Sequence, residues 1–260
     1  MIEFTDEIRE YLWERWQLKH PEKSYGDFEG ALLSYSRVEP FKANENVFSK
    51  NPNYNNEIHT ITRLLTGYFV EKAFEAMKIA PDSNTCEILE EGNIGSPQRI
   101  AKLWTCADTG DDSEMGSGRF MKPVRLATFP NTQKSNIPIT KRISVNSSCS
   151  HHSAPFSTQF AEDSYAIVSY IPDKFVLGIS KLQRLADFVC RRFWLQEDLT
   201  KALYEEVSKA ADTKDVFVGL YNVKHTCEWL RGSRNPEGGF TSEYWGGKFD
   251  NPELRKNLNK

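Results

Sequence analysis

The sequence predicts an α+β protein in which an antiparallel four-stranded sheet carries two helices on one face and follows N-terminal helices. The main observation is the order of patterns in the C-terminal half, where two strands, two helices and two further strands succeed one another. A second observation is the three- and four-residue spacing of apolar side chains before that region, which is typical of helices. The chain has 260 residues, which allows one large domain or two small ones.

Changes of pattern along the chain predict three regions. Residues 1–56 are polar and rich in aromatic residues, and we interpret them as a divergent N-terminal extension. Residues 57–110 carry helical spacing, and residues 111–260 carry the strand and helix patterns of the main α+β domain. No internal repeat or low-complexity segment interrupts this order.

The N-terminal half is expected to hold three helices and two loops. A short helix is predicted at 7–17, and apolar residues at helical spacing predict a longer one at 58–77. A third helix begins at Ser96, where a capping serine precedes a proline in the first turn. The six asparagines within 44–56 and the Asp, Gly and Ser residues of 106–118 predict loops.

The C-terminal half has the more regular patterns. A helix is predicted to open at Ser180, with Gln183 completing a capping box, and a second helix is predicted from about Gln196. Strands are predicted at four places: 143–147, 165–171, 216–231 and 240–246.

Composition excludes several classes of protein. Lys plus Arg is 33 and Asp plus Glu is 36, so the net charge is −3, which argues against a protein held to nucleic acid by bulk charge. No apolar run is long enough to span a membrane, and the acidic N-terminus lacks the features of a signal peptide. We therefore expect a cytoplasmic protein, in which the five cysteines act as buried residues, metal ligands or reactive thiols.

Two cysteine–histidine clusters are candidates for chemistry. Cys149 and His152 are three residues apart, a spacing that suits one metal ion but is weak evidence alone. If 216–231 is one strand, His225 and Cys227 share a face with Trp229 and Arg231. Cys227 then completes a two-Cys, one-His set, which on zinc leaves the fourth position for water, as in catalytic sites.

Two helix starts carry charged groups that allow two interpretations each. Ser180, Lys181 and Arg184 lie at one helix start, which favours either a phosphate site or, from these residues alone, a solvated basic face. Gln196 and Glu197 begin the next helix, where a carboxylate either complements the helix dipole or accepts hydrogen bonds from the edge of a guanine.

Five motifs in one order carry a resemblance to a known family. They are SPQRIAK at 96–102, CSHHSAPF at 149–156, YIP with GISKLQR within 170–184, WLQEDLT at 194–200, and HTCEWLRG at 225–232. Over roughly residues 57–252 the chain resembles GTP cyclohydrolase I, the zinc enzyme that converts GTP into 7,8-dihydroneopterin triphosphate and formate. The resemblance implies the tunnelling fold (T-fold), with residues 111–260 as its catalytic domain.

The resemblance also implies roles for eleven residues. It implies zinc ligands at Cys149, His152 and Cys227, and acid–base or substrate-orienting histidines at His151 and His225. It implies substrate contacts at six further positions: Ser180, Lys181, Arg184, Gln196, Glu197 and Arg231. It further implies a homo-oligomer, a decamer of two pentamers with its sites between subunits, and a product that feeds tetrahydrofolate, another pterin or 7-deazaguanine synthesis.

The chain departs from the family pattern at a few positions, which leaves other functions open. Ser150 occupies a position where the family usually has Glu, and Asp198 one where it usually has Arg. Residues 153–154 replace a pair that is more apolar in the family. None of these changes removes a predicted zinc ligand or His225. The alternatives are a T-fold enzyme for another pterin or a 7-deazaguanine, and a non-catalytic relative that binds GTP or forms a structural or regulatory ring.

Overall fold

The computed structural model describes residues 2–78, 96–105, 123–232 and 238–259. The chain forms two compact units, Met1–Lys122 and Pro123–Lys260, each described by itself below. The predicted loop at 106–118 and the predicted region boundary near residue 110 lie outside the described residues. Within those residues, no helix is both long and apolar enough to cross a membrane.

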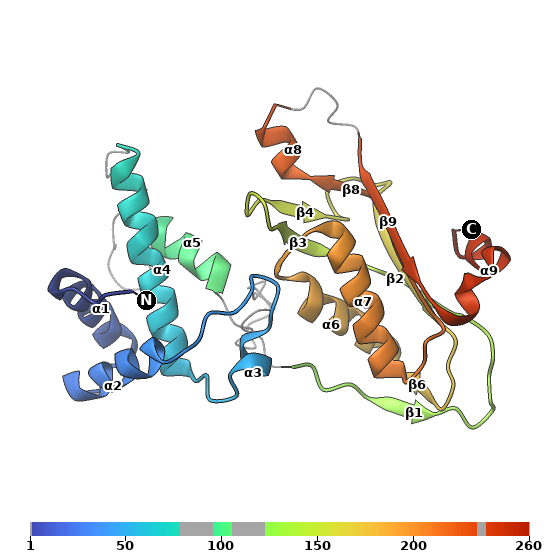
Figure 1. Cartoon of the computed structure of the whole chain (residues 1–260), viewed down its shortest axis with the longest axis horizontal. Helices are drawn as coiled ribbons and strands as arrows, with labels where there is room; N and C mark the ends of the chain where they lie inside the picture. Colours follow the sequence, from blue (N-terminus) through green and yellow to red (C-terminus); the bar gives the residue numbers. More distant parts are fainter. Residues whose placement is uncertain (1, 79–95, 106–122, 233–237, 260) are drawn as a thin grey trace. The chain divides into compact units, whose positions relative to one another are not determined.

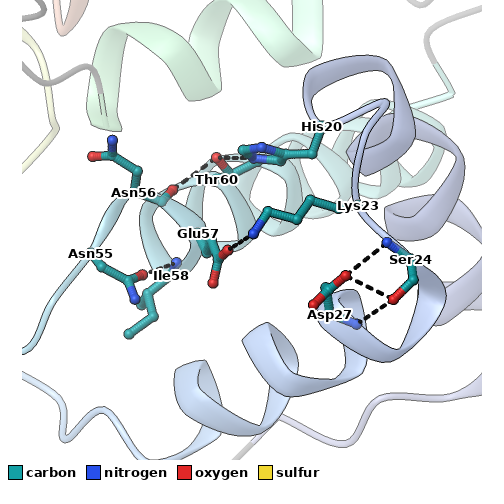
Figure 2. A network of polar contacts seen from close by, with 9 residues as sticks. All are labelled: His20, Lys23, Ser24, Asp27, Asn55, Asn56, Glu57, Ile58 and Thr60. Atoms are coloured by element: carbon teal, nitrogen blue, oxygen red, sulfur yellow. Dashed lines mark hydrogen bonds and ion pairs between the residues drawn. The ribbon is translucent and has the colours of Figure 1, made fainter.

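The first unit is helical. Its helices are α1 (Asp6–Lys19), α2 (Tyr25–Ser36), α3 (Val47–Lys50), α4 (Asn56–Ala76) and α5 (Ser96–Thr105). Side-chain oxygens of Thr5, Ser24, Asn46 and Asn55 cap the first four of these helices by accepting a backbone N–H. Ser24 and Asp27 cap each other's backbone in a capping box (Figure 2).

Two of these helices were not predicted. The sequence of α2 contains two glycines, which weaken helical propensity, but its capping box and its apolar face outweigh that cost. The Asn-rich stretch 44–56 is not all loop, because the Asn46 side chain caps the single turn of α3. Polar side chains with strong N-cap preference therefore start helices here as well as marking turns.

The N-terminal extension and α4 share one hydrophobic core. Trp16 from α1, Phe28 from α2 and Ile61 from α4 are each fully buried in it. Polar contacts add to this packing where the α1–α2 connection meets the start of α4 (Figure 2). There Lys23 Nζ lies 3.2 Å from Glu57 Oε1, and the His20 ring is 3.3 Å from the Thr60 hydroxyl.

Gly67 of α4 leaves room for a side chain of α5. A Cβ at Gly67 would lie 2.0 Å from Gln98 Nε2, so the buried Gln98 side chain occupies the space that a larger residue would take. Gln98 Nε2 donates to the Tyr11 hydroxyl at 2.9 Å, and that hydroxyl donates to Glu71 Oε2 at 2.9 Å. One hydrogen-bonded chain therefore connects α1, α4 and α5.

His59 on α4 gives this helical unit an expected pH dependence. Burial, with a smaller effect from Arg63, lowers the pKa of His59 from 6.5 to about 4. Between pH 6.5 and pH 4, His59 is therefore protonated in the unfolded chain but neutral in the folded chain. The free energy of unfolding falls as the pH drops through this range. We expect a loss of roughly 2–3 kcal/mol over that range.

Urea unfolding at pH 7 and pH 4.5, followed by helical circular dichroism, measures this loss. His59→Gln is the control, because a glutamine keeps a polar side chain but cannot titrate. The variant should lose less stability on acidification than the unchanged protein does. Equal losses in both proteins would contradict the assignment.

The second unit is built on a seven-stranded sheet in the order β2-β5-β8-β4-β3-β7, with β9 also paired to β8. Its strands are β2 (Ile139–Ile143), β3 (Asn146–Cys149), β4 (Pro155–Ser157), β5 (Tyr165–Tyr170), β7 (Phe193–Trp194), β8 (Val216–His225) and β9 (Phe240–Trp245). All pairs are antiparallel except β3 with β7. A separate pair joins β1 (Thr128–Pro130) to β6 (Phe175–Leu177).

The observed architecture is α+β, as predicted, but the sheet is larger than four strands. Strands β2, β5, β8 and β9 form an antiparallel group, and three short strands extend it. Figure 1 shows α6 (Ile179–Cys190) and α7 (Gln196–Ala211) side by side on one face. Val216, Val218 and Leu220 lie at alternate positions of β8, so their buried side chains share one face of the sheet. Leu199 and Leu203 of α7 are also buried.

The C-terminal segment follows β9 as a single-turn 3₁₀ helix (Gly247–Asp250), α9 (Pro252–Lys256) and a second 3₁₀ turn (Asn257–Asn259). Phe249 is fully buried against Phe217 and Ile171. The sequence patterns predicted none of these short elements.

Three predictions about this unit are wrong. The expected strand 143–147 is divided, because β2 ends at Ile143 and β3 begins at Asn146. The expected Ser180–Gln183 capping box does not form, since Gly178 is the N-cap and no side chain caps α6. Gln183 Oε1 instead accepts from Ser144 N at 2.9 Å, and Gln183 Nε2 donates to Ser144 O at 3.0 Å.

The third wrong prediction concerns the strand expected at 216–231. Strand β8 ends at His225, and the short helix α8 (Thr226–Leu230) follows it directly. The Thr226 hydroxyl donates to Pro155 O at 2.7 Å and holds the first residue of this turn against β4. This change of direction determines how the following residues reach the site.

Candidate active site

A pocket of about 550 Å³ lies where β3, β8, α7, α8 and β9 meet. It brings together eight of the eleven residues predicted from the sequence: Cys149, His151, His152, Gln196, Glu197, His225, Cys227 and Arg231. The other three, Ser180, Lys181 and Arg184, belong to α6 and do not line it. Within one chain, the pocket therefore lacks the predicted basic helix start.

A tight turn after β3 brings Cys149 and His152 together. Ser153 N donates to Cys149 O and Cys149 N donates to Ala154 O, both at 2.8 Å. Ser153 has φ 53°, a left-handed conformation that lets the chain reverse within these few residues. The turn thus places two potential ligands from neighbouring positions on the same side of the strand end.

Cys227 completes a group that suits a single metal ion. The ligand atoms of Cys149, His152 and Cys227 all lie within 4.8 Å of one another. Two thiols and one imidazole are a donor set typical of zinc, and three protein ligands leave a tetrahedral ion one further position. The residues present therefore fit the metal that the sequence predicts.

The surroundings of the Cys227 thiol act on its pKa in two opposite directions. Burial raises the pKa of the Cys227 thiol, and the nearby Cys149 sulfur raises it further. The backbone N–H groups of Cys227 and Glu228, at the start of α8, act in the opposite direction. A divalent cation would offset the repulsion between two thiolates, and its binding would release protons.

The helical turn of α8 corrects the predicted arrangement of its residues. Cys227 and Arg231 line the pocket four residues apart, a helical spacing rather than the alternation of a strand. Trp229 was predicted to share their face, but its side chain is 56% exposed and does not line the pocket. The strand alternation holds only up to His225.

His225 is fixed between two aromatic rings at the end of β8. Its ring stacks on Phe156 with centroids 4.3 Å apart and planes 7° apart, and Phe240 contacts it edge-on at 5.1 Å. Burial lowers the pKa of His225, which Glu197 and Glu228 partly offset. The imidazole is thus held in one orientation beside the metal-ligating group.

Gln196 connects His225 to α7 and β9. Its Oε1 lies 2.8 Å from His225 Nε2. Its Nε2 donates to Phe240 O at 3.2 Å and to the Ser242 hydroxyl at 2.9 Å. The neighbouring Glu197 is exposed and lines the pocket, whereas Asp198 does not line it.

Sequence reasoning missed several residues of the pocket: Leu195, Glu228, Gly232, Phe240, Thr241 and Ser242. Glu228 follows a predicted ligand directly, so its position alone could have identified it. The three β9 residues carry no local signal, because only the pairing of β8 with β9 brings them to the site.

Fold and site together define a class of protein. The chain is an α+β protein with a Cys₂His group for one metal ion, which faces an open pocket beside a histidine and a carboxylate. That combination is typical of catalytic metal sites, in which three protein ligands leave one coordination position for water or substrate. Comparison with known proteins narrows the class.

The chain belongs to the GTP cyclohydrolase I family, whose profile matches residues 69–260. It is 30% identical over 232 residues to GTP cyclohydrolase 1 of Wigglesworthia glossinidia brevipalpis, covering 88% of this chain and 91% of that protein. It is 29% identical over 171 residues to the Flavobacterium johnsoniae protein of the same name, covering 65% and 71%. A Clostridium perfringens relative is 29% identical over 187 residues, covering 72% and 94%.

Proposed function

We propose that the protein is a GTP cyclohydrolase I, which hydrolyses GTP at C8 to release formate and yields 7,8-dihydroneopterin triphosphate. The observation that carries the proposal is the meeting of Cys149, His152 and Cys227 in one pocket with His225 and Glu197. The family membership supports it. The product would feed tetrahydrofolate, another pterin or 7-deazaguanine synthesis.

The metal site would be held by Cys149, His152 and Cys227. When bound there, zinc would act as a Lewis acid that lowers the pKa of its bound water toward about 7. The chain's own contribution is to keep three ligands and a pocket in place. The stacked, hydrogen-bonded His225 lies in the same pocket.

The other pocket residues divide the remaining tasks. The Glu197 carboxylate would accept hydrogen bonds from the N1–H and N2–H donors of guanine. Hydrogen bonds to a charged carboxylate are stronger than those to a neutral acceptor. His225 would deliver the proton to the imidazole-ring nitrogen of the purine as that ring opens. His151 would orient the substrate, and Arg231 would contact the triphosphate.

The triphosphate needs more positive charge than this pocket supplies. Among the described lining residues, the one Lys or Arg side chain is Arg231, beside the carboxylates of Glu197 and Glu228. We therefore propose that Ser180, Lys181 and Arg184 of a second copy complete the site. This requires a homo-oligomer, and the T-fold of the family suggests a decamer of two pentamers with sites between subunits.

Mixing two inactive variants tests the shared site. Lys181→Ala removes a triphosphate contact and Cys227→Ser removes a metal ligand, so each variant alone should be inactive. If the two residues serve one site from different subunits, refolded mixtures should regain up to about a quarter of full activity. Mixtures that stay inactive, although the variants form mixed oligomers, would place both residues in the same subunit's site.

Incubation with GTP tests the function itself. Purified protein is supplied with GTP, and formate and the fluorescence of oxidised neopterin are followed with and without a chelator. Product that disappears on chelation would support the proposal. A metal-loaded, assembled protein that binds GTP without releasing formate would favour the non-catalytic relative, and one inert to GTP would favour another pterin or a 7-deazaguanine as substrate.

A further inference from the structure

The hydrogen bonds around Gln196 leave little of its amide free for a ligand. Gln196 is 4% exposed. Both of its N–H groups are used, one on Phe240 O and one on the Ser242 hydroxyl, and its oxygen faces His225 Nε2 at 2.8 Å. Because a carbonyl can only accept, Phe240 O fixes which end of the amide carries nitrogen.

The neighbouring hydroxyls reinforce this orientation. Thr200 Oγ1 donates to Gln196 O at 2.8 Å, which uses its single proton. The 2.7 Å contact between the Thr200 and Ser242 hydroxyls is therefore donated by Ser242. Having given up its own proton, the Ser242 oxygen can only accept from Gln196 Nε2.

This proton count determines the state of the histidine. Since Gln196 Oε1 can only accept, His225 Nε2 must carry the hydrogen in that contact. In the neutral ring the lone pair is then on Nδ1. Among the described residues, no hydrogen bond engages Nδ1. The Phe156 ring stacks on the face of the imidazole, and the Phe240 ring contacts it in a T-shaped arrangement.

We propose that Gln196 is a positioning residue, held by Thr200 and Ser242, which keeps His225 as the Nε2–H tautomer, so that Nδ1 is the nitrogen that takes up a proton from water and passes it to the substrate. The proposal rests on the proposed function, and it gives Gln196 a role other than the substrate contact that the resemblance implies. A guanine contact would need an amide group directed at the pocket. Here both N–H groups and one oxygen lone pair are engaged within the chain.

¹⁵N NMR of histidine-labelled, metal-loaded protein at pH 8 tests the tautomer directly. The His225 signals are assigned by their loss in His225→Asn. We expect a protonated Nε2 and an unprotonated Nδ1 in the unchanged protein, and a mixture of tautomers in Gln196→Met, which keeps the shape but has no amide. A protonated Nδ1 in the unchanged protein would overturn the proposal.

Kinetics separates positioning from substrate contact. Gln196→Met should lower kcat about 5- to 10-fold with KM within about twofold, because the lost hydrogen bond acts on His225 rather than on GTP. Ser242→Ala should shift the tautomer and kcat in the same direction by less, since Phe240 O still orients the amide. A raised KM with an unchanged His225 spectrum would make Gln196 a guanine contact and sink the proposal.

Thr140→Val is the matched control. It breaks a 2.8 Å hydroxyl–hydroxyl contact with Ser169 between β2 and β5, away from the pocket, and should change neither the His225 spectrum nor kcat. The NMR result does not depend on turnover. An Nε2–H tautomer in a protein inert to GTP would therefore refute the proposed function alone, and an Nδ1–H tautomer in an active enzyme would refute the positioning role alone.

Discussion

Replacing Cys227 with serine is expected to leave the protein without its metal and to lower formate release from GTP at least about 100-fold. Loss of a group that only orients a metal ligand already costs about 10–100-fold, so loss of a ligand should cost more. The serine hydroxyl is a much poorer zinc ligand than a thiolate, and Cys149 and His152 remain as two ligands. Inductively coupled plasma mass spectrometry measures the metal per chain, and a formate assay measures activity.

Cys190→Ala provides the matched control for that variant. Cys190 is a fully buried thiol at the end of α6 and does not line the pocket. Burial strongly raises the pKa of Cys190, as expected for an inert core thiol. This variant should retain one metal ion per chain. A Cys227→Ser protein that also retains one ion per chain would show that the ligand set is wrong.

Glu197→Ala is expected to weaken GTP binding about 10- to 100-fold while the metal content stays unchanged. A hydrogen bond to a charged group contributes about 1.5–3 kcal/mol, which corresponds to about 10- to 100-fold in affinity. Because Glu197 is exposed to solvent, its second hydrogen bond to the guanine edge should add little more. Glu197 lines the pocket but is not part of the Cys149–His152–Cys227 group, so its loss should leave the metal in place. Isothermal titration calorimetry with GTP and metal analysis of the same sample measure both effects.

The next residue in the chain supplies the control for charge. Asp198 carries the same charge in the same helical turn, but it does not line the pocket. Asp198→Ala should leave GTP affinity within about threefold, or strengthen it slightly by removing a negative charge near a polyanion. Equal weakening by the two alanine substitutions would mean that Glu197 acts through general charge and does not contact the guanine.

Much of the candidate site could be predicted because its residues are close together in the sequence. Cys149 and His152 share one turn, and Gln196 and Glu197 begin one helix. Joining these pieces required long-range pairing, such as that of Phe156 with His225 across β4 and β8. The resemblance to a family supplied that information, because it relates distant motifs that no local pattern connects.

The rest depended on contacts that the local sequence does not specify. Gln183 has the spacing of a capping residue, but its side-chain amide forms two hydrogen bonds with the backbone of Ser144, which is distant in the sequence. The residues after His225 have a strand-like sequence pattern but form the helix α8. The Thr226 hydroxyl at the start of this helix donates to Pro155 O of β4. Ser242 entered the site through the pairing of β8 with β9. In each case tertiary structure overrode local propensity.

The proposed reaction can be tested by following one carbon atom, C8 of GTP. GTP labelled with ¹³C at C8 is incubated with the metal-loaded protein, and ¹³C NMR follows the label. We expect all label lost from the purine to appear as formate, with an unlabelled pterin as the second product, and a chelator to stop the transfer. Label that stays in the purine, or that enters the pterin, would show that the protein is not a GTP cyclohydrolase I.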